Sequence, residues 1–106
     1  MGKNYHVIVV GSGAAGMMSA IIAARNGKSV VLLEKLSKIG AKLKATGGGR
    51  CNLTNTLDNE TFMSHFGRDG KFMMPALDAF DHKALTSFFK ELGVESHAPD
   101  GFRVSL

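Results

Sequence analysis

The chain has 106 residues, of which 44% are hydrophobic and 21% charged, and its formal net charge is +4 at pH 7. This composition is typical of one small globular domain and argues against a disordered chain. The single cysteine, Cys51, excludes an internal disulfide framework and a cysteine-based zinc site, so we expect a reducing, cytoplasmic location.

A long uncharged stretch near the N-terminus, Val7–Ala24, resembles a membrane or secretory segment at first sight. It is interrupted by a Gly-Ser-Gly sequence and by Gly16, and its first half is β-branched whereas its second half favours helix. A strand, a tight turn and a helix explain this pattern better than one membrane helix does. We therefore expect no association with a membrane.

The first elements predict a strand–helix–strand unit. Residues 5–10 form an apolar, β-branched run that suits a strand buried on both faces, as in a parallel sheet. The glycine-rich residues 11–16 form a turn, and residues 14–26 follow as a helix that Gly27 terminates. Residues 29–33 are the second strand. A unit of this length predicts a right-handed crossover between two parallel strands.

Residues 38–55 interrupt this regular pattern. They contain four glycines and many small polar residues without sustained periodicity, which predicts a long loop with a functional role. Beyond this loop, residues 59–66 are expected to form a helical turn, and Pro75 is expected to begin a short helix.

The last predicted elements are a helix and a hairpin. Asp81 is predicted to be the N-cap of a helix over residues 82–92, which Gly93 ends. Two short strands, residues 94–97 and 102–106, flank a Pro-Asp-Gly turn that indicates a hairpin.

The turn carries the pattern G-x-G-x-x-G in Gly11, Gly13 and Gly16. The first glycine permits the sharp turn, the second lets the backbone approach a pyrophosphate, and the third allows close packing of helix on strand. Free N–H groups at the helix N-terminus would then meet the phosphates. Alone, this hexapeptide is a weak signal.

Glu34 strengthens the interpretation, because it follows the second strand eighteen residues after Gly16. An acid at this place accepts hydrogen bonds from a ribose and disfavours a 2′-phosphate, so NADP is not expected in this site. The alternative is an ordinary carboxylate at the end of a strand, paired with Lys35. These residues do not separate FAD from NAD.

A second motif, K-I-G-A-K-L-K-A-T-G-G-G-R-C-N-L-T-N over residues 38–55, is long and unusual. With the N-terminal unit, it closely resembles the amino-terminal segment of HI0933-like (BaiN/RdsA-type) NAD(P)/FAD-dependent oxidoreductases. The resemblance is strong over residues 5–55 and looser beyond them. Residues 100–104 depart from the family's G-R-V-F-P segment, because Phe102 separates the glycine from the arginine.

The resemblance implies an FAD-binding Rossmann fold followed by further domains, with NAD(P)H as electron donor. Activities in the family include reduction of conjugated steroid-like substrates and of uridine in ribosomal RNA, between which the sequence does not choose. By analogy, residues 46–55 contact the riboflavin half of FAD. The alternative is a structural glycine turn with polar surface residues. Cys51 fits a small buried apolar side chain better than a redox thiol.

The predicted fold class is α/β, with a Rossmann-like βαβ unit and a parallel sheet forming the N-terminal part of a larger flavoprotein. We divide residues 1–106 into a dinucleotide unit (1–36), a glycine-rich cofactor loop (37–57) and a helical segment with the start of a hairpin (58–106). No catalytic residue and no metal ligand is assigned. The predicted cofactor-binding residues are Gly11, Ser12, Gly13, Ala14, Ala15, Gly16, Glu34, Lys35, Lys42, Thr46, Gly47, Gly48, Gly49, Arg50, Cys51, Asn52 and Thr54.

The leading hypothesis is an FAD-dependent oxidoreductase, of which this chain is the N-terminal part and by itself inactive. The alternative is a truncated dinucleotide-binding module with weak or no cofactor binding and no turnover, because two confident parallel strands leave much of a flavin pocket unbuilt. Unpaired sheet edges would then invite self-association. RNA binding through the basic residues 35–50 is a weaker hypothesis, since no interleaved aromatic residues accompany them.

Overall fold

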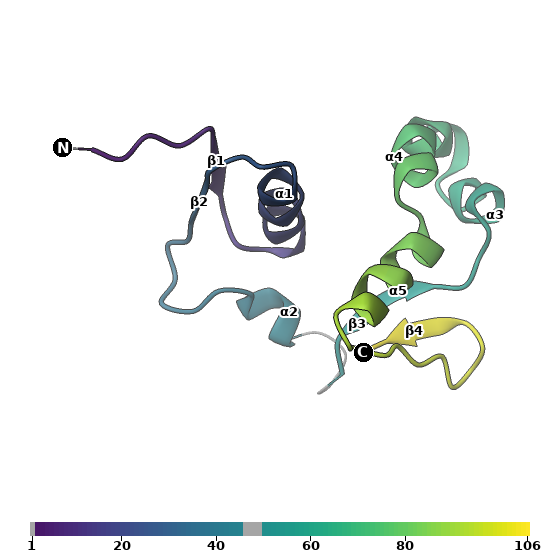
Figure 1. The fold of residues 1–106 in the computed structure, drawn as a ribbon. Coiled ribbons are helices and arrows are strands. Elements are labelled where there is room, and N and C mark those ends of the chain that lie inside the picture. Colours follow the sequence, from purple (N-terminus) through teal and green to yellow (C-terminus); the bar gives the residue numbers. More distant parts are fainter. Residues whose placement is uncertain (1, 46–49) are drawn as a thin grey trace. The chain divides into compact units, whose positions relative to one another are not determined.

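The computed structural model describes residues 2–45 and 50–106 and divides into two compact units (Figure 1). We call residues 1–49 the N-terminal unit and residues 50–106 the C-terminal unit. Each unit contains its own two-stranded sheet, one parallel and one antiparallel. The chain is therefore of the α/β class, as predicted.

The N-terminal unit is a strand–helix–strand arrangement. Strand β1 (Val7–Val10) pairs in parallel with β2 (Val30–Leu33), and helix α1 (Ala14–Arg25) packs against both strands (Figure 1). A short helix, α2 (Ala41–Ala45), follows β2. The predicted parallel βαβ unit is confirmed.

Helix α1 ends where its sequence predicts. Asn26 is the C-cap, and its side-chain amide donates a 2.8 Å hydrogen bond to the carbonyl of Ile22. Gly27 follows with φ of 76°, a left-handed conformation that favours glycine after a helix. The chain can therefore leave the helix and return to the sheet within a few residues.

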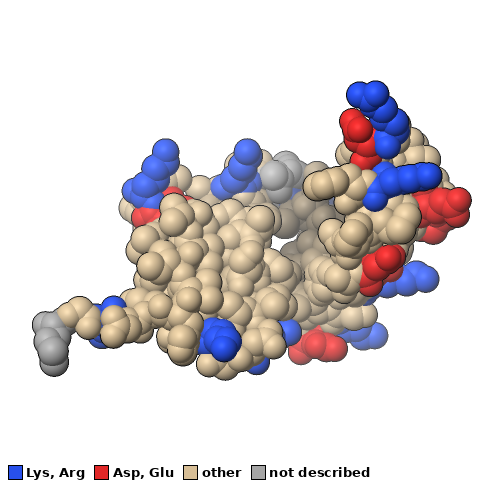
Figure 2. Space-filling model, turned by 90° about the horizontal axis from the view of Figure 1, so that it is seen from above, with Lys and Arg blue, Asp and Glu red and all other residues tan. Residues whose placement is uncertain are grey.

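Strand β1 differs from the prediction in its burial. Val7 and Val9 are half-buried, whereas Ile8 and Val10 are 62% and 82% exposed. The expectation of burial on both faces is therefore wrong for this structure, because α1 covers one face of the sheet and leaves Ile8 and Val10 open. In Figure 2, uncharged residues cover most of the surface shown over β1, β2 and α1.

The C-terminal unit is mainly helical and contains a small antiparallel sheet. Strand β3 pairs with β4, with a bulge between Asn52 and Thr54. In chain order, its elements are β3 (Asn52–Asn55), α3 (Asn59–Ser64), the 3₁₀ helix η2 (Gly67–Met73), α4 (Met74–Ala79), α5 (His82–Glu91) and β4 (Arg103–Ser105).

Two sequence expectations need correction here. Residues 38–55 were expected to be irregular, but they contain α2 and β3. The expected hairpin of residues 94–97 with 102–106 is reduced to a bridge between His97 and Ser105, and β4 has β3 as its main partner. Strand β3 gains its hydrogen bonds from a segment about fifty residues later, and no local pattern reveals such a pairing.

The predicted helix α5 is confirmed together with its ends. The Asp81 side chain accepts a 3.0 Å hydrogen bond from the N–H of Ala84, which satisfies a donor in the first turn. Gly93 follows the helix with φ of 80°. Phe88 of α5 and Val104 of β4 are buried and form the core of this unit.

In the part of the chain that the structure describes, no helix has both the length and the apolar character needed to cross a bilayer.

Candidate cofactor site

The glycine-rich turn joins β1 to α1 and is anchored to the sheet at its first residue. The N–H of Gly11 donates a 2.7 Å hydrogen bond to the carbonyl of Leu33, and Gly11 has φ of 98°. Residues that carry a side chain rarely adopt a backbone conformation with such a φ, so glycine is required here. The turn therefore leaves the strand in a fixed direction.

The second and third glycines of the turn have opposite surroundings. A Cβ on Gly13 would have no atom within 4 Å. A Cβ on Gly16 would overlap the carbonyl oxygen of Gly11 and lie 3.4 Å from Cγ1 of Val9 in β1. The close packing of helix on strand predicted for Gly16 is thus observed, while the space over Gly13 is open.

The N-terminus of α1 offers donors to an anion. In an α-helix the first four N–H groups have no intrahelical partner, and here the N-cap Gly13 supplies no side chain to satisfy them. Ala14 and Ala15, the first two residues of the helix, are exposed. The helix dipole adds partial positive charge at this end.

The charge of the N-terminal unit also favours an anionic ligand. Residues 1–49 contain seven lysines and arginines, and Glu34 is their only acidic residue. A unit of this charge attracts phosphates over distances up to about one Debye length. The Glu34 carboxylate is therefore the one negative side chain in a unit that is otherwise basic.

Glu34 is held by three hydrogen bonds. Its Oε1 accepts from the Ser12 N–H at 3.0 Å and from the Ser12 hydroxyl at 2.8 Å. Its Oε2 accepts from the Leu36 N–H at 2.9 Å. These bonds, above all those from the Leu36 and Ser12 backbones, lower the pKa of Glu34 from an ordinary value of 4.5 to about 2. The side chain is therefore a fixed anion at neutral pH.

Gly40 is a member of this arrangement that sequence reasoning did not place in the site. It is buried, has φ of 66°, and its N–H donates to the Ser12 hydroxyl at 3.4 Å. Its signal in the sequence is the central glycine of the K-x-G-x-K pattern with which the second motif begins. The beginning of the second motif thus contacts the glycine-rich turn through Ser12.

The remaining predicted residues lie in three places. Lys35 and Lys42 are exposed on the N-terminal unit, and Thr46 to Gly49 lie outside the described residues. The others belong to the C-terminal unit, namely Arg50, Cys51, Asn52 and Thr54.

In the C-terminal unit, Asn52 and Thr54 belong to β3, and Cys51 immediately precedes this strand. The Cys51 side chain is half-buried, and its carbonyl accepts a 3.0 Å hydrogen bond from the N–H of Leu106. Arg50 is exposed. Asn52 and Thr54 thus form part of β3, and Cys51 is hydrogen-bonded next to it, so a structural role accounts for part of the second motif.

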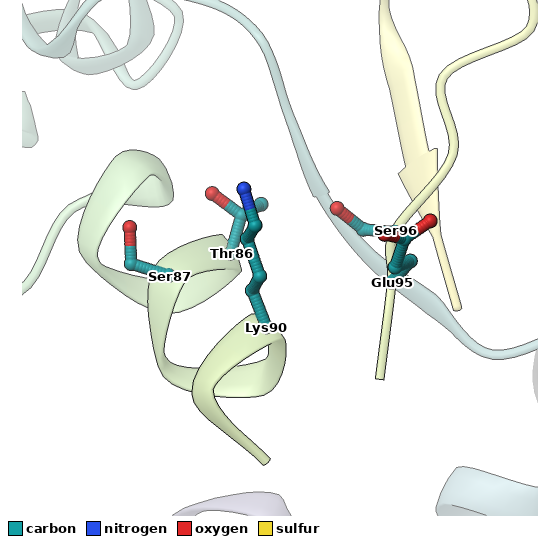
Figure 3. A pocket seen from close by; sticks show the side chains of 5 residues that line it. All are labelled: Thr86, Ser87, Lys90, Glu95 and Ser96. Carbon is teal, nitrogen blue, oxygen red and sulfur yellow. The ribbon is translucent and has the colours of Figure 1, made fainter. Parts of the chain in front are cut away.

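A hollow of about 400 Å³ in the C-terminal unit is lined by none of the predicted site residues. Thr86, Ser87 and Lys90 of α5 line one side, and Glu95 and Ser96 line the other (Figure 3). Within residues 2–45 and 50–106, no group of three or more His, Cys, Asp or Glu side chains is placed to hold a metal ion.

Comparison with known proteins gives a family and several relatives. Residues 5–105 match the family described as "HI0933-like protein Rossmann domain". The chain is 36% identical over 96 residues to 3-dehydro-bile acid delta(4,6)-reductase of Clostridium scindens, which covers 89% of this chain and 23% of that protein. It is 35% identical over 91 residues to ribosomal RNA dihydrouridine synthase of Haemophilus influenzae, covering 85% of this chain and 22% of that protein.

A shorter similarity reaches 50% identity over 48 residues with 3-oxosteroid 1-dehydrogenase of Mycolicibacterium smegmatis, covering 45% of this chain and 8% of that protein. The chain thus spans less than a quarter of the length of these relatives.

Proposed function

The chain belongs to the HI0933-like Rossmann-domain family, and from this premise we propose that it binds FAD as the cofactor-binding part of an oxidoreductase. The observation that carries the proposal is the joining of the glycine-rich turn to the strand-end carboxylate by the Ser12–Glu34 hydrogen bonds. The names of the relatives support redox chemistry, because they are a bile acid reductase, a dihydrouridine synthase and an oxosteroid dehydrogenase.

The residues of the turn fit a dinucleotide pyrophosphate. Open space lies over Gly13, which precedes α1. The first N–H groups of an α-helix have no partner within the helix and point out of its N-terminus. Backbone donors at this place would hold the two phosphates without a side chain in the way. The basic character of residues 1–49 supports the same assignment.

Glu34 fits the ribose of the adenosine half. A carboxylate has about four lone-pair positions, and the three hydrogen bonds to Glu34 leave acceptor capacity on Oε2. A ribose hydroxyl would donate to this oxygen. The negative charge that Glu34 carries at neutral pH would repel a 2′-phosphate, which supports FAD or NAD over NADP at this site.

FAD, when bound, supplies hydride chemistry, and the protein contributes binding, orientation and the local charge. We extend the proposal to NAD(P)H as electron donor of the full-length enzyme and to Thr46–Thr54, Lys35 and Lys42 as further contacts to the cofactor. Lys35 and Lys42 are exposed and positively charged, which suits contacts to phosphate oxygens at the edge of the site.

A second candidate is a dinucleotide-binding module without turnover. It is favoured by the exposure of Ile8 and Val10 in β1, since parallel sheets are normally covered on both faces. Such an uncovered sheet would build only part of a flavin pocket. The two candidates differ in whether the chain retains flavin after purification.

The experiment is to purify the full chain and compare its flavin absorption with its protein concentration. A flavin content near one per chain supports the proposal, whereas a colourless protein that does not take up added FAD contradicts it. Gly13→Val should abolish FAD binding, because the new side chain enters the open space reserved for the pyrophosphate. Unchanged flavin content in this variant would refute the assignment of the pyrophosphate to this turn.

A further inference from the structure

Ser12 is the most deeply buried side chain among the described residues, although it lies in a turn assigned to a ligand. It is 2% exposed, while its neighbours Gly13 and Ala14 are exposed. The sequence predicts that Ser12 contacts the cofactor, which would require a side chain open to the ligand. Here the burial turns the hydroxyl away from solvent, so a direct contact with a bound dinucleotide does not explain it.

The hydroxyl of Ser12 is instead used within the protein. It donates to Glu34 Oε1 at 2.8 Å and receives the Gly40 N–H at 3.4 Å. The first distance is that of a strong charge-assisted hydrogen bond, and the second is at the weak limit. The hydroxyl therefore acts mainly on Glu34, and it secondarily ties the start of the second motif to the turn.

The geometry at Glu34 shows what this bond does. Ser12 holds one carboxylate oxygen with two donors, and Leu36 holds the other with one. Donors on both oxygens fix the plane of the carboxylate and leave Oε2 as the oxygen with room for a further donor. The same bonds keep the pKa of Glu34 low, so this oxygen remains an acceptor.

We propose that Ser12 is a positioning residue that orients Glu34 for an unphosphorylated ribose and does not itself contact the dinucleotide. The inference rests on the proposed function, because it assumes that Glu34 accepts from the adenosine ribose. It changes the role predicted for Ser12 from a cofactor contact to a residue that acts through Glu34. Its consequence is that the effect of Ser12 on binding exists only while the Glu34 carboxylate is present.

A double-mutant cycle tests this dependence in the full chain. The affinity for ADP, which carries the adenosine ribose and pyrophosphate without the flavin, is measured by calorimetry in Ser12→Ala, Glu34→Gln and the double variant. Ser12→Ala should weaken ADP binding about tenfold, the scale of one charge-assisted hydrogen bond. The double variant should bind no more weakly than Glu34→Gln alone, because the two residues act as one unit.

Controls separate this effect from a general loss of structure. Ser19→Ala removes a hydroxyl from an exposed position on α1 and should bind ADP like the wild type. The Ser12→Ala defect should also shrink for 2′-deoxy-ADP, which lacks one of the ribose hydroxyls. Additive losses in the cycle, or equal losses for the two nucleotides, would overturn the inference and return Ser12 to a direct or structural role.

A second readout needs no ligand. The carboxyl ¹³C signal of Glu34 is followed from pH 6 to pH 3 in wild type and Ser12→Ala. The wild-type signal should stay that of a carboxylate, whereas the variant should begin to titrate within this range. If Ser12→Ala does not fold, Ser12→Cys, which keeps only a weak donor at this position, is used in its place. An unchanged titration would overturn the positioning role.

These readouts distinguish the two proposals. A wild-type chain that binds neither ADP nor FAD contradicts the proposed function, yet the titration still decides whether Ser12 controls Glu34. A chain that binds ADP while Ser12→Ala behaves like Ser19→Ala supports the proposed function and contradicts this inference.

Discussion

Gly16 is the residue at which one added methyl group should do most damage to the N-terminal unit. In Gly16→Ala, the Cβ would overlap the carbonyl oxygen of Gly11, lie 3.1 Å from the Gly11 carbonyl carbon and lie 3.4 Å from Cγ1 of Val9. Gly11 cannot move aside easily, because its N–H is bound to the Leu33 carbonyl at 2.7 Å. Relief therefore requires α1 to move away from β1.

Two effects of opposite sign decide the size of the loss. Alanine is favoured over glycine inside a helix by about 1 kcal/mol. Overpacking costs about 1–3 kcal/mol, and the upper part of this range applies because backbone atoms must shift. We expect Gly16→Ala to lower the free energy of unfolding by about 1–2 kcal/mol, or the melting temperature by roughly 4–15 °C.

Thermal and urea unfolding of the full chain measures this loss, and amide hydrogen exchange in α1 locates it. Ser19→Ala, on the exposed side of the same helix, is the matched control and should melt near the wild-type temperature. If Gly16→Ala melts at or above the wild-type temperature, the close approach of α1 to the turn is not a feature of the folded protein.

Three other predictions address separate parts of the molecule. Because the pKa of Glu34 is lowered from 4.5 to about 2 in the folded chain, its carboxylate should stabilise the fold fully above pH 4.5 and lose this effect as the pH falls toward 2. In Glu34→Gln, the free energy of unfolding measured from pH 2 to 6 should therefore depend less on pH than in the wild type, and an equal pH dependence of the two proteins would contradict this. Asp81→Ala should lower the melting temperature of the C-terminal unit, because it removes the acceptor for the Ala84 N–H, whereas Asp81→Asn keeps an acceptor and should melt close to the wild type. An equal drop in melting temperature for both variants, measured by circular dichroism, would show that the charge of Asp81 matters and not its acceptor. Gly70→Ala should destabilise the same unit by about 1–3 kcal/mol in urea unfolding, because its Cβ would overlap the Met63 carbonyl oxygen, and a wild-type midpoint would refute that contact.

The difference between Gly13 and Gly16 separates ligand access from packing within one hexapeptide. Both glycines belong to the same pattern, yet a side chain meets open space at one and backbone at the other. A variant at Gly13 should therefore affect binding more than stability, and a variant at Gly16 should affect stability first. Measuring both properties in both variants distinguishes a cofactor turn from a purely structural one.

The sequence by itself determined the features that depend on neighbouring residues. The strand, turn and helix of residues 7–25, the helix ends at Gly27 and Gly93, and the Asp81 cap were all predictable. Each follows from hydrogen bonds or backbone conformations within a few residues, so local composition is sufficient. The glycine pattern and Glu34 at the end of the second strand could also be identified from the sequence, because one βαβ unit sets the spacing between them.

Only the tertiary structure decided how distant residues use their hydrogen-bonding groups. The pairing of β3 with β4 gave regular structure to residues that looked like a loop, because a strand needs a partner and that partner lies far along the chain. Likewise, Ser12 and Glu34 are 22 residues apart, and Ser12 and Gly40 are 28 apart. Burial of the Ser12 hydroxyl between them, which no local pattern encodes, turned a predicted cofactor contact into a proposed support for the carboxylate.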